Sequence, residues 1–186
     1  FNIHPGGAKD TMINAIAVAS EIQSLLPEAE SPRNTEGYEG FYHLTSMSGD
    51  VAHAESEYII RDHDAEKFAA KEENLRRIEK AMNEKYGEGT VKLEIKEQYR
   101  NMSEKIRPCY HLIENAEEAA RRAGMEPIVL PIRGGTDGCQ LSFKGLPCPN
   151  LGTGGHAYHG PYEHITVEGM DKSVDVVTEL VKLYAM

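Results

Sequence analysis

Apolar residues recur at helical spacing in five stretches of the chain. The longest predicted helix runs from Ala65 to Tyr86, begins after Asp62-His63-Asp64, and ends at Gly87 and Gly89. Its buried stripe is marked by Phe68, Leu75, Ile78 and Met82. The other predicted helices cover residues 7–26 (ended by Pro27), 108–123, 136–143 and 167–184, the last with Met170, Val174, Val177, Val181 and Tyr184 on its apolar side.

Strand signals lie between these helices. Residues 40–48 and 51–61 flank a turn at Ser48 to Asp50, which predicts a β-hairpin. Val91, Leu93 and Ile95 alternate with charged residues, as in a strand with one wet face. Residues 127–132 form a short apolar run that predicts a buried strand, and residues 149–151 predict another short strand.

The order of these elements indicates two domains of different class. Residues 1–106 run helix, strand, strand, helix, strand, which is a ferredoxin-like α+β unit with an antiparallel sheet and two helices but largely without its first strand. We therefore expect the chain to start inside a domain. Residues 107–186 alternate helices with apolar strands, which indicates part of an α/β domain, although about 80 residues are few for an independent doubly wound sheet.

Composition and charge narrow the range of possible binding partners and the location of the protein. Hydrophobic residues make up 40% and charged residues 27%, the balance of a soluble globular protein. The net charge of −10 argues against nucleic acid and anionic membranes. Phe1 to Gly7 do not resemble a signal peptide, and three cysteines without a paired motif predict a reducing, cytoplasmic location.

Two glycine-rich segments could carry chemistry. Residues 131–138 lead from a predicted strand into a turn with Arg133, Thr136 and Asp137, which could bind an anion or form a plain turn with a helix cap. In residues 152–163, His156 and His159 could bind one metal ion or could be surface residues.

Three further polar residues are most simply structural. His4 precedes a predicted helix, Arg61 ends a strand before Asp62, and Asn101 follows a strand. By pattern alone these positions indicate a cap, a salt bridge and a turn. The chain contains neither a Gly-x-Ser-x-Gly nucleophile motif nor a phosphate-binding P-loop motif.

Several segments in a fixed order resemble the peptidase T family of tripeptide aminopeptidases, which use two zinc ions. The resemblance covers nearly the whole chain and is specific as an ordered set. The segments are Asn2–Gly6, Thr35–His43, Tyr58–Asp62, Asn101–Met102, Pro131–Gly138, Leu141–Phe143, Gly145–Asn150, and Tyr158–Gly160 followed by Glu163.

The resemblance implies a fold and a partner. Residues 1–106 match the lid or dimerisation domain, and residues 107–186 match the last part of an α/β zinc-peptidase catalytic domain. A homodimer through the lid and a tripeptide substrate are the implied partners.

The resemblance also implies roles for individual residues. His159 matches a zinc ligand, and His4 matches a lid histidine that stabilises the oxyanion in the partner's active site. The positions implied to hold the substrate, chiefly its C-terminal carboxylate, are Arg61, Asn101, Arg133, Gly135 and Thr136. His156 is a neighbour without an implied role.

The chain departs from the family pattern in lacking most metal ligands and the general base. The family's His-x-Asp motif, bridging Asp and Glu-Glu pair are expected before Phe1, and Glu72-Glu73 lie on a charged helix of the lid segment. We therefore expect the chain alone to be inactive. A related amidohydrolase, of the aminoacylase or carboxypeptidase G type, and a non-catalytic dimerisation module are the alternatives.

Overall fold

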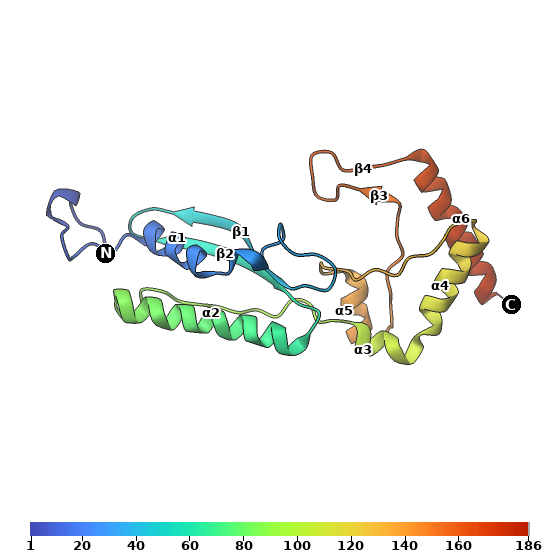
Figure 1. Ribbon diagram of the computed structural model, residues 1–186, viewed down its shortest axis with the longest axis horizontal. Coiled ribbons are helices and arrows are strands. Elements are labelled where there is room, and N and C mark those ends of the chain that lie inside the picture. The colour runs from blue at the N-terminus through green and yellow to red at the C-terminus, as the bar shows by residue number, and fades with distance from the viewer. Residues whose placement is uncertain (186) are drawn as a thin grey trace. The chain divides into compact units, whose positions relative to one another are not determined.

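A computed structural model describes residues 1–185, which pack into two units (Figure 1). The first unit contains Phe1–Glu97 together with Pro131–Gly134. The second unit contains Gln98–Leu130 and the residues from Gly135 onward. The predicted domain boundary at residue 106 stays a prediction.

The first unit is built from a hairpin and two long helices, with short 3-10 turns between them. The predicted hairpin is confirmed, with an antiparallel register from Phe41 opposite Arg61 to Gly49 opposite Ala54 and an irregularity between Leu44 and Ser46. In chain order the elements are η1 (Pro5–Gly7), α1 (Ala15–Leu25), η2 (Glu28–Glu30), β1 (Phe41–Gly49), β2 (Ala54–Arg61) and α2 (Ala65–Tyr86).

Helix α1 begins eight residues later than the predicted start at Gly7, at Ala15. The side chain of Asn14 accepts hydrogen bonds from the backbone N–H groups of Ile16 (3.0 Å) and Ala17 (3.3 Å), so Asn14 is the N-cap. An asparagine that binds the first free N–H groups fixes where a helix starts, and apolar spacing does not report it.

Helix α2 matches its predicted limits and supplies most of the first unit's core. Leu75, Ile78 and Met82 are buried with Leu26 and with Tyr42 of β1. Ile22, Tyr58, Ile60, Tyr86, Val91 and Leu93 pack around this cluster. Both helices therefore cover the hairpin, and burial raises the pKa of the Tyr42 and Tyr58 hydroxyls.

The N-cap of α2 makes the stability of this unit depend on pH. Asp64 Oδ1 accepts hydrogen bonds from the N–H groups of Lys67 (3.0 Å) and Glu66 (2.9 Å), which hold the pKa of its carboxyl below the ordinary value. A carboxyl with a lowered folded-state pKa stabilises the fold above its unfolded pKa and loses that effect as pH falls through the folded pKa.

We therefore expect Asp64→Ala to destabilise the chain at pH 7 and to have a smaller effect at an acidic pH below the lowered pKa of this carboxyl, where the wild-type side chain has lost its charge. Urea unfolding of both proteins at the two pH values measures this difference. An equal loss of stability at both would contradict a role for the carboxylate charge.

The predicted strand at residues 91–95 is wrong, because the structure assigns no strand there. The Asn83 side chain accepts a hydrogen bond from Val91 N (2.8 Å) and donates one to Val91 O (2.9 Å), and Glu79 Oε1 accepts one from Leu93 N (2.7 Å). In a ferredoxin-like unit the last strand pairs with the first, and residues 1–3 form no strand. Side chains of α2 therefore satisfy the backbone groups that a neighbouring strand would bind.

The second unit is mainly helical. The predicted helices at residues 108–123, 136–143 and 167–184 are confirmed, with limits shifted by up to a few residues. In chain order the elements are α3 (Ser103–Ile106), η3 (Arg107–Cys109), α4 (His111–Arg122), α5 (Asp137–Phe143), β3 (Gly155–His156), β4 (His164–Ile165) and α6 (Val167–Tyr184).

Two strand predictions in the later part of the chain are wrong. Residues 127–132 are irregular, and Ile128 and Leu130 are 76% and 72% exposed. Residues 149–151 also form no strand. A buried strand requires partners on both sides, and the sheets of residues 1–185 consist only of the pairs β1–β2 and β3–β4.

Helix α6 uses a different face from the one that the apolar pattern suggested. Its buried residue is Val176, which packs with Leu180 and Leu183 against Ala119 and Ala123 at the end of α4. The predicted apolar side is exposed, at Met170, Val174, Val177, Val181 and Tyr184. The helix therefore carries two apolar faces, of which the second unit buries one.

Candidate substrate-binding and metal-binding residues

The candidate residues are divided between the two units. The first unit contains His4, Arg61 and Arg133, and the second contains Asn101, Gly135, Thr136 and His159.

Arg133 is held by the loop that precedes β1. Its guanidinium donates hydrogen bonds to Thr35 O (2.6 Å), Thr35 Oγ1 (2.6 Å) and Glu39 O (3.1 Å), and it lies over the ring of Phe41 at 5.1 Å. Nε of Arg133 is buried and has no hydrogen-bond partner among residues 1–185. In this arrangement the guanidinium fixes residues 35–39.

Arg61 and His4 lie at ends of elements in the first unit. Arg61 is the last residue of β2, is half-buried, and donates from Nη1 to its neighbour's carbonyl, Ile60 O (2.8 Å). His4 is exposed and caps η1, where its Nδ1 accepts a hydrogen bond from Gly6 N (3.1 Å). Because Nδ1 is the acceptor in this cap, the neutral imidazole carries its proton on Nε2.

Thr136 and Gly135 lie at the start of α5. Thr136 Oγ1 accepts hydrogen bonds from Cys139 N (3.2 Å) and from the Asn150 side chain (3.3 Å). Gly135 lies directly against the ring of Tyr99, where an added Cβ would be only 2.1 Å away. Residues 131–138 thus contain the turn with a helix cap that was one of the two predicted interpretations, because Thr136 is the N-cap of α5.

Asn101 also acts as a local cap in this structure. Its Oδ1 accepts a hydrogen bond from Ser103 N (2.9 Å), at the beginning of α3. Asn101 and Thr136 therefore both stabilise local structure, each at the start of a helix.

His159 lies in the loop between β3 and β4, in a left-handed backbone conformation (φ 63°). Glu163 holds this conformation, because its carboxylate accepts a hydrogen bond from His159 N (2.8 Å). Non-glycine residues in this region are uncommon and occur often at functional sites. The His159 side chain is exposed, while His156 stacks on His164 with ring centroids 5.3 Å apart.

Residues 1–185 do not form a metal site by themselves. No three His, Cys, Asp or Glu side chains among them are grouped so that they could hold a metal ion. A catalytic zinc ordinarily has three protein ligands and a water. The residues that the structure describes therefore do not fit a complete zinc site, and His159 can supply only one ligand.

Sequence patterns missed a buried charged cluster in the first unit. Lys71 of α2 lies between the carboxylates of Glu30 and Asp62, and its Nζ is 5.0 Å from the centre of the Tyr42 ring. Lys71 continues the apolar stripe of α2, three residues after Phe68 and four before Leu75. That spacing was a usable signal, because a lysine on a core-facing stripe must find a partner.

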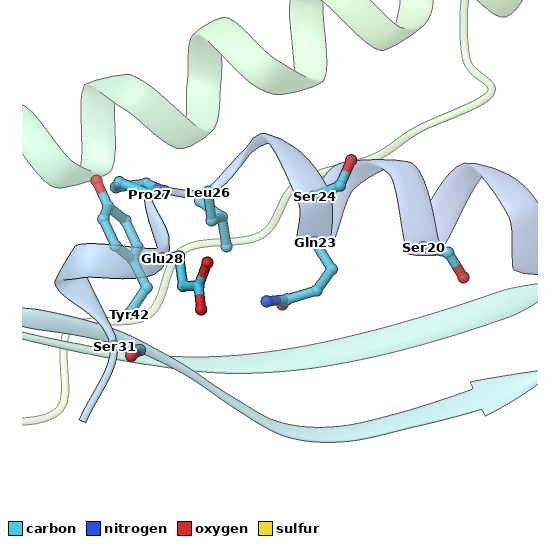
Figure 2. Close-up of a pocket in the computed structure, with 8 residues that line it drawn as sticks. All are labelled: Ser20, Gln23, Ser24, Leu26, Pro27, Glu28, Ser31 and Tyr42. Atoms are coloured by element: carbon cyan, nitrogen blue, oxygen red, sulfur yellow. The ribbon is translucent and has the colours of Figure 1, made fainter. Parts of the chain in front are cut away.

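A cavity of about 350 Å³ also lies in the first unit, between α1 and β1 (Figure 2). It is lined by Ser20, Gln23, Ser24, Leu26, Pro27, Glu28, Ser31 and Tyr42. The hydroxyls of Ser20 and Ser24 are hydrogen-bonded to carbonyls of their own helix, Ile16 O (2.9 Å) and Glu21 O (2.7 Å). The cavity contains none of the candidate residues.

Among residues 1–185, no helix is both long enough and apolar enough to cross a lipid bilayer.

Comparison with known proteins first defines a class. Residues 2–90 match the family described as the peptidase dimerisation domain. The matched residues include the hairpin and the two helices of the first unit.

The whole chain is similar to one kind of peptidase. It is 50% identical over 184 residues to peptidase T of Clostridium novyi, covering 99% of this chain and 45% of that protein. It is 54% identical over 183 residues to peptidase T of Caldanaerobacter subterraneus, covering 98% of this chain and again 45% of the relative. These identities confirm the predicted resemblance to the peptidase T family, and the chain spans less than half the length of these relatives.

Solved structures confirm the mixed α+β fold class. The aminopeptidase PepT from Bacillus cereus superposes with a TM-score of 0.63 and 19% identity, over 99% of this chain and 49% of that one. A tripeptidase from Staphylococcus aureus gives a TM-score of 0.64 and 18% identity, over 97% of this chain and 48% of that one.

Proposed function

We propose that this chain is part of a metal-dependent aminopeptidase that releases the N-terminal residue from tripeptides. One observation supports this above all: identity of 50% to peptidase T extends over 184 residues, through both units. The comparisons do not favour a related amidohydrolase. We further propose zinc as the metal, with two ions per enzyme, and the cytoplasm as the location, which the three free cysteines suit.

In this proposal the chain supplies part of the active site. His159 provides one metal ligand, and the other ligands and the general base come from polypeptide outside the chain. Arg61, Asn101, Arg133, Gly135 and Thr136 contribute to binding the substrate, chiefly its C-terminal carboxylate. A planar guanidinium suits this task because it can donate two parallel hydrogen bonds to a carboxylate.

The first unit also has a proposed role in assembly. We propose that it forms a homodimer, because residues 2–90 match the peptidase dimerisation domain. His4 would then act in the partner's active site, where its Nε2–H stabilises the negative charge that develops on the carbonyl oxygen under attack. A single donor of this kind contributes roughly 3 kcal/mol to stabilising a transition state.

The second unit gives a physical reason why the chain would need additional polypeptide. The outer face of α6 and residues 128–130 expose apolar side chains, including Val174 (64%) and Ile128 (76%). Large exposed apolar areas are typical of surfaces that another part of a protein covers.

A chimeric enzyme tests the proposal. In peptidase T of Clostridium novyi, the segment that matches this chain is replaced by residues 1–186. We expect the chimeric enzyme to release the N-terminal residue from Ala-Ala-Ala, to bind zinc, and to be poorly active on dipeptides and N-acyl amino acids. Residues 1–186 alone should be inactive on all of these substrates.

Two results would contradict the proposal. One is a folded, zinc-loaded chimeric enzyme that hydrolyses N-acyl amino acids but leaves tripeptides intact. The other is cleavage of Ala-Ala-Ala by the isolated chain, because the metal ligands and the general base are proposed to lie outside it.

A further inference from the structure

The buried lysine of α2 has no role in the function proposed above, although its surroundings are unusual. The Lys71 side chain is only 10% exposed, it forms an ion pair with Glu30, and its Nζ is 3.8 Å from Asp62 Oδ2. Burial lowers the pKa of this amine. Because a buried ion pair adds little to stability compared with apolar residues of the same shape, stability alone does not explain the cluster.

The two carboxylates differ in their surroundings. The side chain of Glu30 is 41% exposed, whereas that of Asp62 is 3% exposed. The ion pair of Lys71 with Glu30 therefore lies at the protein surface. Asp62, in contrast, is buried, and Lys71 supplies the positive charge that faces it inside the protein.

Asp62 is fixed on three sides. Its Oδ1 accepts a hydrogen bond from Asp64 N (3.0 Å), and its Oδ2 faces Lys71. Gly40 lies so close that an added Cβ would be 2.0 Å from Oδ2. An aspartate held in this way leaves its own backbone little freedom.

Asp62 directly follows Arg61, the last residue of β2. A restraint on Asp62 is thus a restraint on the backbone that carries the Arg61 guanidinium. Recognition of a carboxylate by an arginine depends strongly on orientation, because both N–H groups must point at the two oxygens together.

We propose that Lys71 is a positioning residue that, through Asp62, holds Arg61 in the orientation that binds the C-terminal carboxylate of a peptide substrate. This inference rests on the proposed function, because it requires Arg61 to bind that carboxylate. Lys71 itself touches no substrate.

The test compares a tripeptide with its C-terminal amide in the chimeric enzyme. We expect Lys71→Met to raise the KM for the tripeptide on the order of tenfold, with kcat little changed, because the substrate is bound less well but reacts normally once bound. The KM for the amide should stay the same, since it has no carboxylate for Arg61. Lys71→Arg should restore the wild-type preference for the free acid.

Two further variants complete the experiment. Asp62→Asn keeps the shape of the side chain and should lose the preference for the free acid, which keeps the test decisive if Lys71→Met does not fold. Glu30→Gln is the matched control, because it removes the more exposed partner of Lys71 and leaves Asp62 in place. It should keep the preference.

The outcomes separate this inference from the proposed function. If Arg61→Ala keeps the preference for the free acid, the assignment of Arg61 is wrong and Lys71 has nothing to position. If Arg61→Ala loses the preference while Lys71→Met and Asp62→Asn keep it, only the inference about Lys71 is overturned. If Lys71→Met and Asp62→Asn each lose as much activity on the amide as on the free acid, Lys71 has a purely structural role. That result would also overturn the inference about Lys71.

Discussion

Gly40→Ala is expected to lower the free energy of unfolding by about 3 kcal/mol, the upper range for forcing atoms into a packed site. The added Cβ would lie 2.0 Å from Asp62 Oδ2, 2.5 Å from Asp62 Cγ and 2.6 Å from the backbone oxygen of Arg61. The carboxylate is confined by Lys71, and the backbone of Arg61 is paired with Phe41 in the hairpin. Neither group can move without breaking other contacts, so the start of β1 must shift.

Chemical denaturation of the isolated chain, followed by circular dichroism, measures this effect. The matched control is Gly7→Ala, because an added Cβ at Gly7 meets nothing within 4 Å. The control should change stability by less than about 1 kcal/mol in either direction. Similar stabilities for the two variants would show that Gly40 is not packed as described.

His159→Ala is expected to reduce kcat/KM of the chimeric enzyme for Ala-Ala-Ala at least about a thousandfold, because metal-activated water is the proposed nucleophile. Bound zinc per enzyme, measured by atomic absorption, should fall in the same variant. The backbone of His159 is left-handed, and its N–H donates a hydrogen bond to Glu163, which holds the residue in place in the loop.

His156→Ala is the control for this second prediction. His156 lies three residues earlier in the same segment, is also exposed, and stacks on His164. Its removal should leave zinc content and kcat/KM within about threefold of the wild-type values, as for a residue outside the reacting centre. A loss at His156 as large as that at His159 would mean that the metal ligand had been assigned to the wrong histidine.

The sequence predicted the hairpin and the helices α2 and α5 well, because local signals determine them. Asp64 and Thr136 are caps whose side chains the structure shows on the first free N–H groups of α2 and α5. The turn at Asp50 likewise forms through its own hydrogen bonds to Ala52 N (2.7 Å) and His53 N (3.0 Å). These contacts lie within a few residues in sequence, so they can be read from a short window.

The isolated strands were predicted less well, because a strand depends on partners that local sequence does not specify. Residues 91–95 and 127–132 have strand-like patterns, but residues 1–185 offer no neighbouring strand to either. The same limit applies to α6. This helix has two apolar faces, and the local sequence does not specify which of them packs against α4.

The candidate site shows a similar division. Ordered motifs selected the residues, yet they did not reveal that Arg133 is bound to Thr35 and Glu39, nearly a hundred positions earlier in the chain. Long-range contacts of this kind leave no periodic trace in the sequence. Lys71 is the opposite case, because its place on the stripe of α2 was visible and only its partners were not.

The hydrogen bonds from α2 to Val91 and Leu93 have a consequence for how the first unit opens. Asn83 and Glu79 bind the amide hydrogens of these two residues, so both hydrogens become accessible to deuterated water only when side chains of α2 release them. Amide exchange at Val91 and Leu93 should therefore follow the opening of α2, and the segment and the helix behave as one cooperative unit although no ladder joins them.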